Sequence, residues 1–302
     1  MSRASRSHKL WLGMVVALLL AWLLSLTIGA VRIPLSEVAS ILLGRAASQP
    51  AWSVIILDFR LPKSLAAVLA GSALAIAGLQ MQTLFRNPLA DPYILGISSG
   101  ASLGAALVIL LTGGGGVHFL AKLGFLGDVG VIVASALGAL VVFVGVILLA
   151  RQVHTVTLLV LGVLVGYLVN ALVRILIHFS LPEQVQAYLS WTFGSFGGVS
   201  WPQLTWFAPA TVLGILMAVG SIKSLNGLLL GETYARSLGI SPRRARWGII
   251  LSASLLAGTV TAFCGLIGFI GIAVPHLARS LLRSSDHREA LPACAILGGT
   301  VA

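Results

Sequence analysis

Charged residues are scarce in this sequence, and their scarcity excludes most classes of soluble protein. Asp, Glu, Lys and Arg make up 9% of the 302 residues, whereas soluble domains carry about 25%. Hydrophobic residues make up 58% of the chain. So few charges cannot cover a globular surface with polar side chains, so a bilayer is the natural solvent of this protein.

Acidic residues, cysteines and clustered histidines are also few. Eight acidic residues stand against 19 basic ones, for a net charge of +11. In so apolar a chain, this excess is typical of cytoplasmic loops and not of a nucleic-acid surface. Cys264 and Cys294 fit neither a disulfide framework nor a metal cluster, and the six histidines lack metal-ligand spacing. We therefore predict no catalytic residue, no metal site and no nucleic-acid partner.

The sequence lacks a phosphate-binding loop, because none of its four lysines follows a glycine. It also lacks the acidic relay of an ion-coupled carrier. The only ionisable residues in the long apolar runs are Arg174 and, one turn later, His178, both near an outer end. The pattern favours a permease driven by a separate ATPase. A channel or ion-coupled carrier that works without an ATPase is the alternative.

Apolar runs long enough to cross a bilayer, about 20 residues each, recur along the chain. They lie at 10–31, 64–85, 93–111, 129–150, 156–179, 204–222 and 247–264. A Gly-rich stretch at 265–274, with 275–282, predicts a short, broken eighth crossing, and a ninth run begins near Ala290. The fold class predicted is an all-α polytopic membrane protein with about eight spans plus a truncated ninth, in a single transmembrane domain over 1–302.

The basic residues indicate the orientation of these spans. With the amino terminus inside, 13 basic residues fall on the inside and 6 on the outside, which is the bias expected of cytoplasmic loops. Residues 1–9 then form a cytoplasmic head. The inside set is Arg3, Arg6, Lys9, Arg86, Arg151, Lys223, Arg236, Arg243, Arg244, Arg246, Arg279, Arg283 and Arg288.

Small residues recur at helical spacing in two of the runs. Gly96, Gly100 and Gly104 lie four residues apart, as do Gly162 and Gly166. Such stripes let membrane helices approach closely. Close packing within one bundle is favoured over a dedicated dimer seam.

The segment 223–246 has the pattern of a folded loop. It contains five basic residues and one acid, Glu232. We expect a short helix to Leu230, a break at Gly231, and a second helix from Glu232 to Leu238 capped by Gly239. Composition alone leaves a docking surface for a cytoplasmic partner and an ordinary basic loop equally open.

The external stretch at 188–201 mixes aromatic residues with glycine. Aromatics are typical of the membrane interface, and glycines indicate irregular backbone, which is tolerated at membrane depth only where it is buried or lines water. A pathway wall and an interfacial belt are both compatible with it.

Three long segments resemble a known family. They are "RLPKSLAAVLAGSALAIAGLQMQTLFRNPLADPYILGISSGASLGAAL" at 60–107, "GETYARSLGI" at 231–240 and "CGLIGFIGIAVPHLARSLLRSSDHREALP" at 264–292. The chain resembles the membrane-spanning permease subunits of FecCD-type ABC importers, which take up iron-siderophores, haem and cobalamin.

The resemblance implies an assembly in the bacterial inner membrane. It implies ten spans and a homodimer that works with two cytoplasmic ATPase subunits and an external, periplasmic binding protein. Membrane lipid surrounds it, and ATP with Mg²⁺ is held by the ATPase, so this chain binds no cofactor itself. Iron-siderophore is the leading cargo, with haem and cobalamin as alternatives.

The resemblance also implies residue roles. Arg60 and Lys63 match external positions that dock the binding protein, although the family usually has Arg at the second, and Lys lacks its bidentate fork. Within the cytoplasmic coupling segment 223–246, residues 225–240 match the ATPase-coupling helices. His154 and Thr155 match the inner gate, and Arg174, Tyr188 and Trp191 the outer pathway. The coupling residues are Leu225, Asn226, Leu230, Gly231, Glu232, Ala235, Arg236, Leu238 and Gly239.

The family continues beyond the position of Ala302 with the rest of a ninth span and a tenth. We therefore expect the sequence to be a fragment of a longer protein. A shortened, nonfunctional structural subunit is the alternative.

Overall fold

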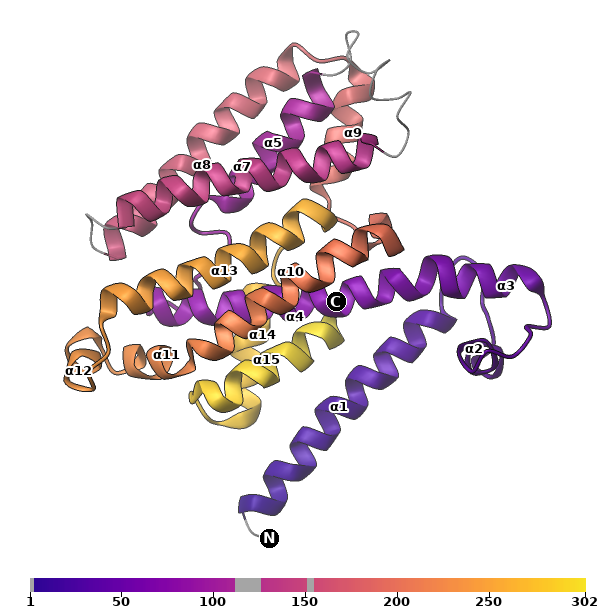
Figure 1. Cartoon of the computed structure of the whole chain (residues 1–302), viewed down its shortest axis with the longest axis horizontal. Helices are drawn as coiled ribbons and strands as arrows, with labels where there is room; N and C mark the ends of the chain where they lie inside the picture. The colour runs from indigo at the N-terminus through magenta and orange to yellow at the C-terminus, as the bar shows by residue number, and fades with distance from the viewer. Residues whose placement is uncertain (1–2, 112–125, 151–154) are drawn as a thin grey trace.

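The computed structural model describes residues 3–111, 126–150 and 155–302, and in these residues the regular structure is entirely helical (Figure 1). The fold class predicted from the sequence is confirmed. The helices are α1 (Arg3–Thr27), α2 (Leu35–Leu42), α3 (Pro50–Val54), α4 (Leu61–Phe85), α5 (Ile97–Leu111), α7 (Leu126–Ala150), α8 (Thr155–His178), α9 (Pro182–Thr192), α10 (Trp201–Gly220), α11 (Ile222–Leu229), α12 (Glu232–Ser237), α13 (Pro242–Cys264), α14 (Ile270–Leu282) and α15 (His287–Val301). A π-helical stretch, η1 (Ile55–Arg60), leads into α4, and a short 3-10 turn, η3 (Phe196–Gly198), precedes α10.

Each apolar run of the sequence corresponds to one helix. Six segments within the described residues are long and apolar enough to cross a membrane. Five lie on α1, α7, α8, α10 and α13, and the sixth runs through α3, η1 and α4. Two shorter apolar helices, α5 and α14, match the third run and the broken eighth crossing. The last helix, α15, matches the ninth run. The small helices α2 and α3 were not predicted.

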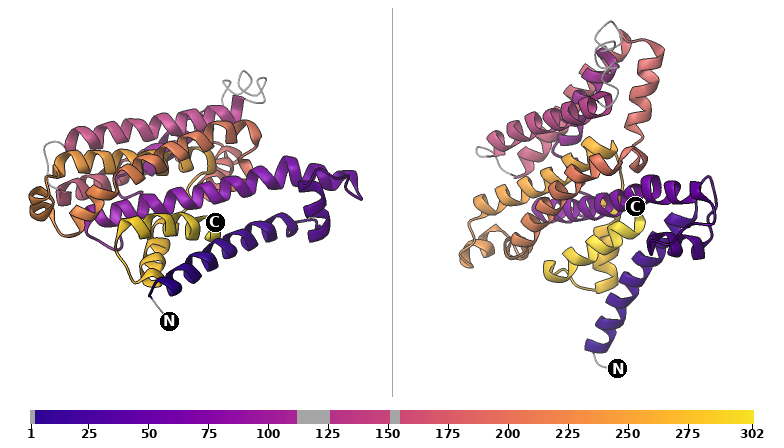
Figure 2. Two further views of the ribbon diagram at one scale, coloured as in Figure 1. Left: turned by 60° about the horizontal axis from the view of Figure 1, so that its bottom comes forward. Right: turned by 45° about the vertical axis from the view of Figure 1, so that its right-hand side comes forward.

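Helix α4 lies at the centre of the molecule. Figures 1 and 2 show it between two groups of helices, with α5, α7 and α8 on one side and α14, α15 and α1 on the other. It contacts α15, α13, α14 and α10. Most of its side chains from Ala70 to Leu84 are buried, as expected for a helix that is apolar on all its faces.

Two glycines let other helices touch the backbone of α4. A Cβ atom at Gly71 would overlap the carbonyl oxygen of Gly298 on α15, and one at Gly78 would overlap that of Gly271 on α14. Membrane helices depend on this kind of close approach because lipid supplies no hydrophobic drive between them. The central helix is therefore in direct backbone contact with two neighbours.

The glycine stripe of the third run packs within the chain. A Cβ atom at Gly100 or Gly104 would overlap a carbonyl oxygen of α7, and one at Gly162 on α8 would overlap the carbonyl oxygen of Ile94. Gly166 lies next to Ser99, where a Cβ atom would stand 3.4 Å from the serine hydroxyl.

Gly96 makes the predicted close approach, since a Cβ atom there would lie 3.1 Å from the carbonyl oxygen of Gly162, but its predicted place in a helix is wrong. Gly96 does not lie in the helix, because residues 93–96 form a turn and α5 begins at Ile97. Asp91 starts this turn, since its carboxylate accepts a hydrogen bond of 2.7 Å from the backbone N–H of Tyr93. Gly96 has φ +77°, a conformation that glycine adopts without strain, and its carbonyl accepts the N–H of Gly100.

Helix α14 is short and enters from an irregular segment. Its 13 residues span about 20 Å at 1.5 Å per residue, which is less than the roughly 30 Å hydrocarbon core. Residues 265–268 before it are not helical, and both Gly265 and Phe269 have positive φ, at +73° and +74°. The predicted short, broken apolar segment is therefore present, and its helix begins at Ile270. That it crosses the membrane stays a prediction.

Candidate functional site

Two short helices, α11 and α12, form a folded unit at one end of the molecule, on the left in Figure 1. Gly231 separates them with φ +116°, a value that an L side chain rarely adopts. Gly239, with φ +74°, follows α12, and Pro242 begins α13. The predicted arrangement of two helices with a glycine break and a glycine end is confirmed.

Buried contacts and one carboxylate hold this unit against the helices beside it. Leu225 on α11 and Ala235 on α12 are fully buried. Glu232 on α12 lies 3.1 Å from the guanidinium of Arg246 on α13 and 3.7 Å from that of Arg236. Because Arg246 is mostly buried, its pair with Glu232 fixes α12 to the start of α13.

The outer face of the unit exposes apolar side chains. Leu230 is 67% exposed and Leu238 50% exposed. Both line a groove of about 670 Å³ together with Lys223, Asn226, Tyr234 and Arg288. Apolar residues grouped in a groove with a cationic rim are typical of a protein contact surface.

The two predicted docking residues lie at the opposite end of α4. Arg60 is half-buried, and its guanidinium donates to the carbonyl of Leu26 at 2.7 Å and to that of Val31. It therefore holds the end of α1 against the start of α4. Lys63 is exposed.

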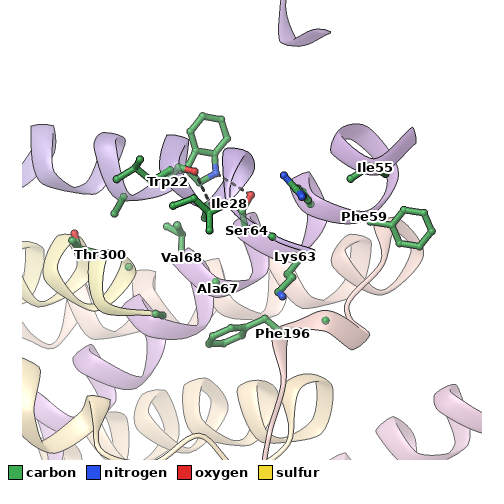
Figure 3. A pocket seen from close by; sticks show the side chains of 18 of the residues that line it. Trp22, Ile28, Ile55, Phe59, Lys63, Ser64, Ala67, Val68, Phe196 and Thr300 are labelled. Carbon is green, nitrogen blue, oxygen red and sulfur yellow. Dashed lines mark hydrogen bonds between the residues drawn. The ribbon is translucent and has the colours of Figure 1, made fainter. Parts of the chain in front are cut away.

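Arg60 and Lys63 also line a cavity of about 760 Å³, between α1, α4, η3 and α15. Figure 3 shows Trp22, Phe59, Lys63 and Phe196 around it. The indole N–H of Trp22 donates to the hydroxyl of Ser64 at 3.1 Å, which ties α1 to α4. The cavity combines aromatic walls with two cations, a lining that suits a bulky anionic or aromatic molecule.

Two of the three predicted pathway residues, Tyr188 and Trp191, lie on α9. Tyr188 is 5% exposed, and its hydroxyl lies 2.5 Å from that of Ser102 on α5. Its ring stacks on that of Trp191 with centroids 6.2 Å apart. Tyr188 thus anchors α9 on α5, which the sequence did not indicate. Arg174 is exposed on α8.

The predicted inner gate is only partly described. His154 lies outside the described residues, and Thr155 is the first residue of α8. The gate role of both stays a prediction.

Neutral polar residues inside the helix bundle were missed by sequence reasoning. Gln80 on α4 is fully buried, and its side-chain N–H₂ donates to the hydroxyl of Ser252 on α13 at 3.1 Å. Near the end of α4, Thr83 contacts the buried ring of His287 on α15. A search that included amide and hydroxyl residues in the apolar runs could have found both.

Known proteins resemble the chain over almost its whole length. A sequence model of the FecCD transport family matches residues 17–302. The vitamin B12 import system permease protein BtuC of Klebsiella pneumoniae is 36% identical over 296 residues, covering 98% of this chain and 83% of its own. The uncharacterised ABC transporter permease protein YvrB of Bacillus subtilis is 33% identical over 286 residues, covering 91% of this chain and 78% of its own.

A solved structure has the same fold. It is described as an inward-facing conformation of a metal-chelate type ABC transporter, and it matches with a TM-score of 0.82 and 28% sequence identity. The match covers 97% of this chain and 87% of the other. Family, relatives and fold agree, and the chain therefore belongs to the FecCD transport family, as an ABC transporter permease.

Proposed function

We propose that this permease is the membrane-spanning subunit of an ATP-driven importer that moves a metal chelate into the cytoplasm by alternating access. The observation that carries the proposal is the family match over 17–302, together with the folded α11–α12 unit at one end of the bundle. An iron(III)-siderophore is our leading cargo. Cobalamin is the second candidate, favoured by the likeness to the vitamin B12 permease, and haem is the third.

We place the α11–α12 end in the cytoplasm and the Arg60 end outside. The distribution of charge supports this orientation. Lys223, Arg236 and Arg246 lie in or beside the unit, and Arg86 and Arg288 lie on elements that contact it. Basic residues accumulate on the cytoplasmic side of membrane proteins. The amino terminus is then cytoplasmic and the membrane is the bacterial inner membrane.

The groove beside α11 and α12 is our proposed contact for the ATPase subunit. Leu230 and Leu238 supply apolar contacts, and Lys223 and Arg288 at the rim attract acidic side chains. ATP with Mg²⁺ is bound and hydrolysed by that subunit. This chain converts the movement of the ATPase into opening and closing of the inner gate, for which we retain His154 and Thr155.

The external binding protein docks at Arg60 and Lys63 in this proposal. Lys63 is exposed to solvent and can meet a carboxylate. Arg60 uses two of its N–H groups on the carbonyls of Leu26 and Val31, and a guanidinium has five. It can therefore bind a carboxylate while it continues to hold α1. A second copy of the chain completes the permease as a homodimer.

Reconstitution in proteoliposomes tests the proposal. The permease is combined with its ATPase and with the binding protein, which is loaded in turn with ferric siderophore, cobalamin or haem. We expect one loaded form to stimulate ATP hydrolysis and to drive uptake. Failure of all three to stimulate hydrolysis would refute an ATP-driven importer of these chelates. Uptake without any ATPase would favour a channel or an ion-coupled carrier.

A further inference from the structure

Three helices meet where α11 contacts the bundle, in a polar chain that is half-buried at Asn226 and buried at His287 and Thr83. Asn226 belongs to α11, His287 is the first residue of α15, and Thr83 lies in the last turn of α4. The His287 side chain is 1% exposed and Thr83 is 5% exposed. The two ring nitrogens of His287 contact Asn226 and Thr83, each at 2.8 Å. One imidazole therefore joins residues that are far apart in the sequence.

The hydrogen bonds fix the direction of each group. The side-chain N–H₂ of Asn226 donates to the carboxylate of Asp286 at 2.7 Å, so its oxygen faces His287. That oxygen accepts the backbone N–H of His287 at 2.9 Å and the ring Nδ1 at 2.8 Å, which assigns the ring proton to Nδ1. The Thr83 hydroxyl lies 2.8 Å from Nε2 and 2.8 Å from the carbonyl of Leu79 on its own helix. Because Nε2 of the neutral ring carries no proton, the hydroxyl donates to the ring in this tautomer.

This chain is satisfied only in one relative position of its helices. A shift of α11 by about an ångström stretches these bonds beyond their range of 2.7–3.2 Å. Because His287 and Thr83 are buried, a broken bond between them leaves a donor or acceptor without water, which is costly. When α11 moves, we therefore expect α4 and α15 to move with it, because this costs less free energy than breaking the hydrogen bonds.

Helix α4 can carry such a movement across the bundle. It is in backbone contact with α14 at Gly78 and with α15 at Gly71. Its far end carries Arg60 and Lys63, beside the cavity. A rigid displacement of α4 thus reaches both ends of the molecule.

We propose that His287 is a positioning residue for transport, which couples displacement of the ATPase-bound α11 to α4 and α15 through Asn226 and Thr83. The inference rests on the proposed function, because it requires an ATPase that binds α11 and displaces it. It adds a residue outside the 223–246 segment to the coupling machinery.

Substitution of Thr83 gives the sharpest test, because Thr83→Val keeps the shape and removes the hydroxyl. The matched control is Thr211→Val on α10, where the buried hydroxyl has no hydrogen-bond partner among the described residues. Both variants are reconstituted with the ATPase and the loaded binding protein, and the readout is molecules transported per ATP hydrolysed. ATPase co-purification and melting temperature are measured beside it.

We expect Thr83→Val to bind the ATPase and to hydrolyse ATP, with transport per ATP lowered about fivefold to tenfold, the factor that one neutral hydrogen bond supplies. Thr83→Ser should restore coupling, and Thr211→Val should match the unmodified protein. His287→Ala should lower coupling similarly, and adding Thr83→Val should lower it no further, since both remove one connection.

Two results would overturn the coupling role of His287. One is Thr83→Val with unchanged transport per ATP, while the unmodified complex is stimulated by loaded binding protein. The other is a fall in ATPase binding or in melting temperature that accompanies the fall in transport, because a purely structural contact would give that result. An unmodified complex that shows no stimulation refutes the proposed function itself, which separates the two failures.

Discussion

Two serines on one helix provide a direct measure of how much a buried hydrogen bond stabilises this bundle. Ser252 and Ser254 both lie in α13 and are 0% and 6% exposed. Ser252 is bonded to Gln80 on α4 and donates to the carbonyl of Gly214 on α10 at 2.9 Å. The Ser254 hydroxyl has no partner among the described residues. The two substitutions to alanine remove the same atom from different surroundings.

The expected destabilisation follows from the hydrogen bonds that each substitution removes. Interhelical hydrogen bonds in membrane proteins contribute about 0.6 kcal/mol on average and about 1.7 kcal/mol at most. Ser252→Ala removes the link of α13 to both Gln80 and Gly214, and it leaves the fully buried Gln80 amide without this partner. We expect a loss of about 1–2 kcal/mol, or about a fivefold to thirtyfold shift in the unfolding equilibrium.

Ser254→Ala should behave differently, because a buried hydroxyl without a partner costs desolvation free energy and returns none. We expect its effect to lie within about 0.5 kcal/mol of zero or to be stabilising. Unfolding free energy is measured in mixed detergent micelles with increasing denaturing detergent. A third variant that joins Gln80→Leu to Ser252→Ala tests the amide, since replacing both partners should recover part of the loss.

Equal destabilisation by Ser252→Ala and Ser254→Ala would refute the reasoning, because the hydrogen bonds would then contribute nothing measurable. The same conclusion would follow if Gln80→Leu lowered the unfolding free energy of Ser252→Ala by as much as it lowers that of the unmodified protein. Either result would leave α4, α13 and α10 held by packing only.

Three further predictions concern charge, packing and pH. Lys63→Glu should weaken docking of the binding protein at low salt and less so at high salt, because the Debye length falls to about 8 Å at physiological ionic strength. Lys63→Arg is the control. An unchanged affinity for Lys63→Glu would remove the docking role of this residue. Gly104→Ala should destabilise the protein by about 1–3 kcal/mol, since the new Cβ overlaps the α7 backbone. Gly130→Ala faces open space and should stabilise the protein by about 0.5–1 kcal/mol. Unfolding in detergent measures both, and equal effects would contradict the close contact of α5 with α7. The pKa of Asp286 is held below 3.8 by the backbone N–H of Arg288 and by the side-chain amide of Asn226. The stability that Asp286 contributes is therefore present above pH 3.8 and lost as pH falls through the lowered pKa. Asp286→Asn should flatten that part of the pH profile of stability, and an unchanged profile would count against Asp286 as the N-cap of α15.

The arrangement of spans could be predicted because each run of apolar residues is long and is bounded by polar residues or glycine. The α11–α12 unit could be predicted for a similar reason. Gly231, Gly239 and Pro242 mark its break, its end and the next start, and each acts through local backbone geometry. Local rules of this kind need no knowledge of distant contacts.

The turn before α5 could not be predicted from the spacing of glycines. Gly96 continues the interval of four residues, but the carboxylate of Asp91 captures the backbone N–H of Tyr93 and starts a turn. A side-chain contact to the backbone thus prevailed over a helical period. The period alone gives no sign of that competition.

The contacts of Arg60 and His287 could not be predicted from the sequence, for a different reason. Arg60 bonds to residues 29 and 34 positions earlier, and His287 bonds to Thr83 at a separation of 204 residues. Which partner such a side chain meets is decided by how the helices pack. A single sequence records the residue types and not those pairings.

The short length of α14 also leaves a hinge beside it within the bundle. Its 13 residues leave about 10 Å of the hydrocarbon core to the five residues before it. Over this distance the backbone is irregular in place of two further helical turns, and its side chains include the exposed Phe269. Because the backbone at 265–269 is not helical, the angle between α13 and α14 can change through backbone rotation there without unwinding either helix.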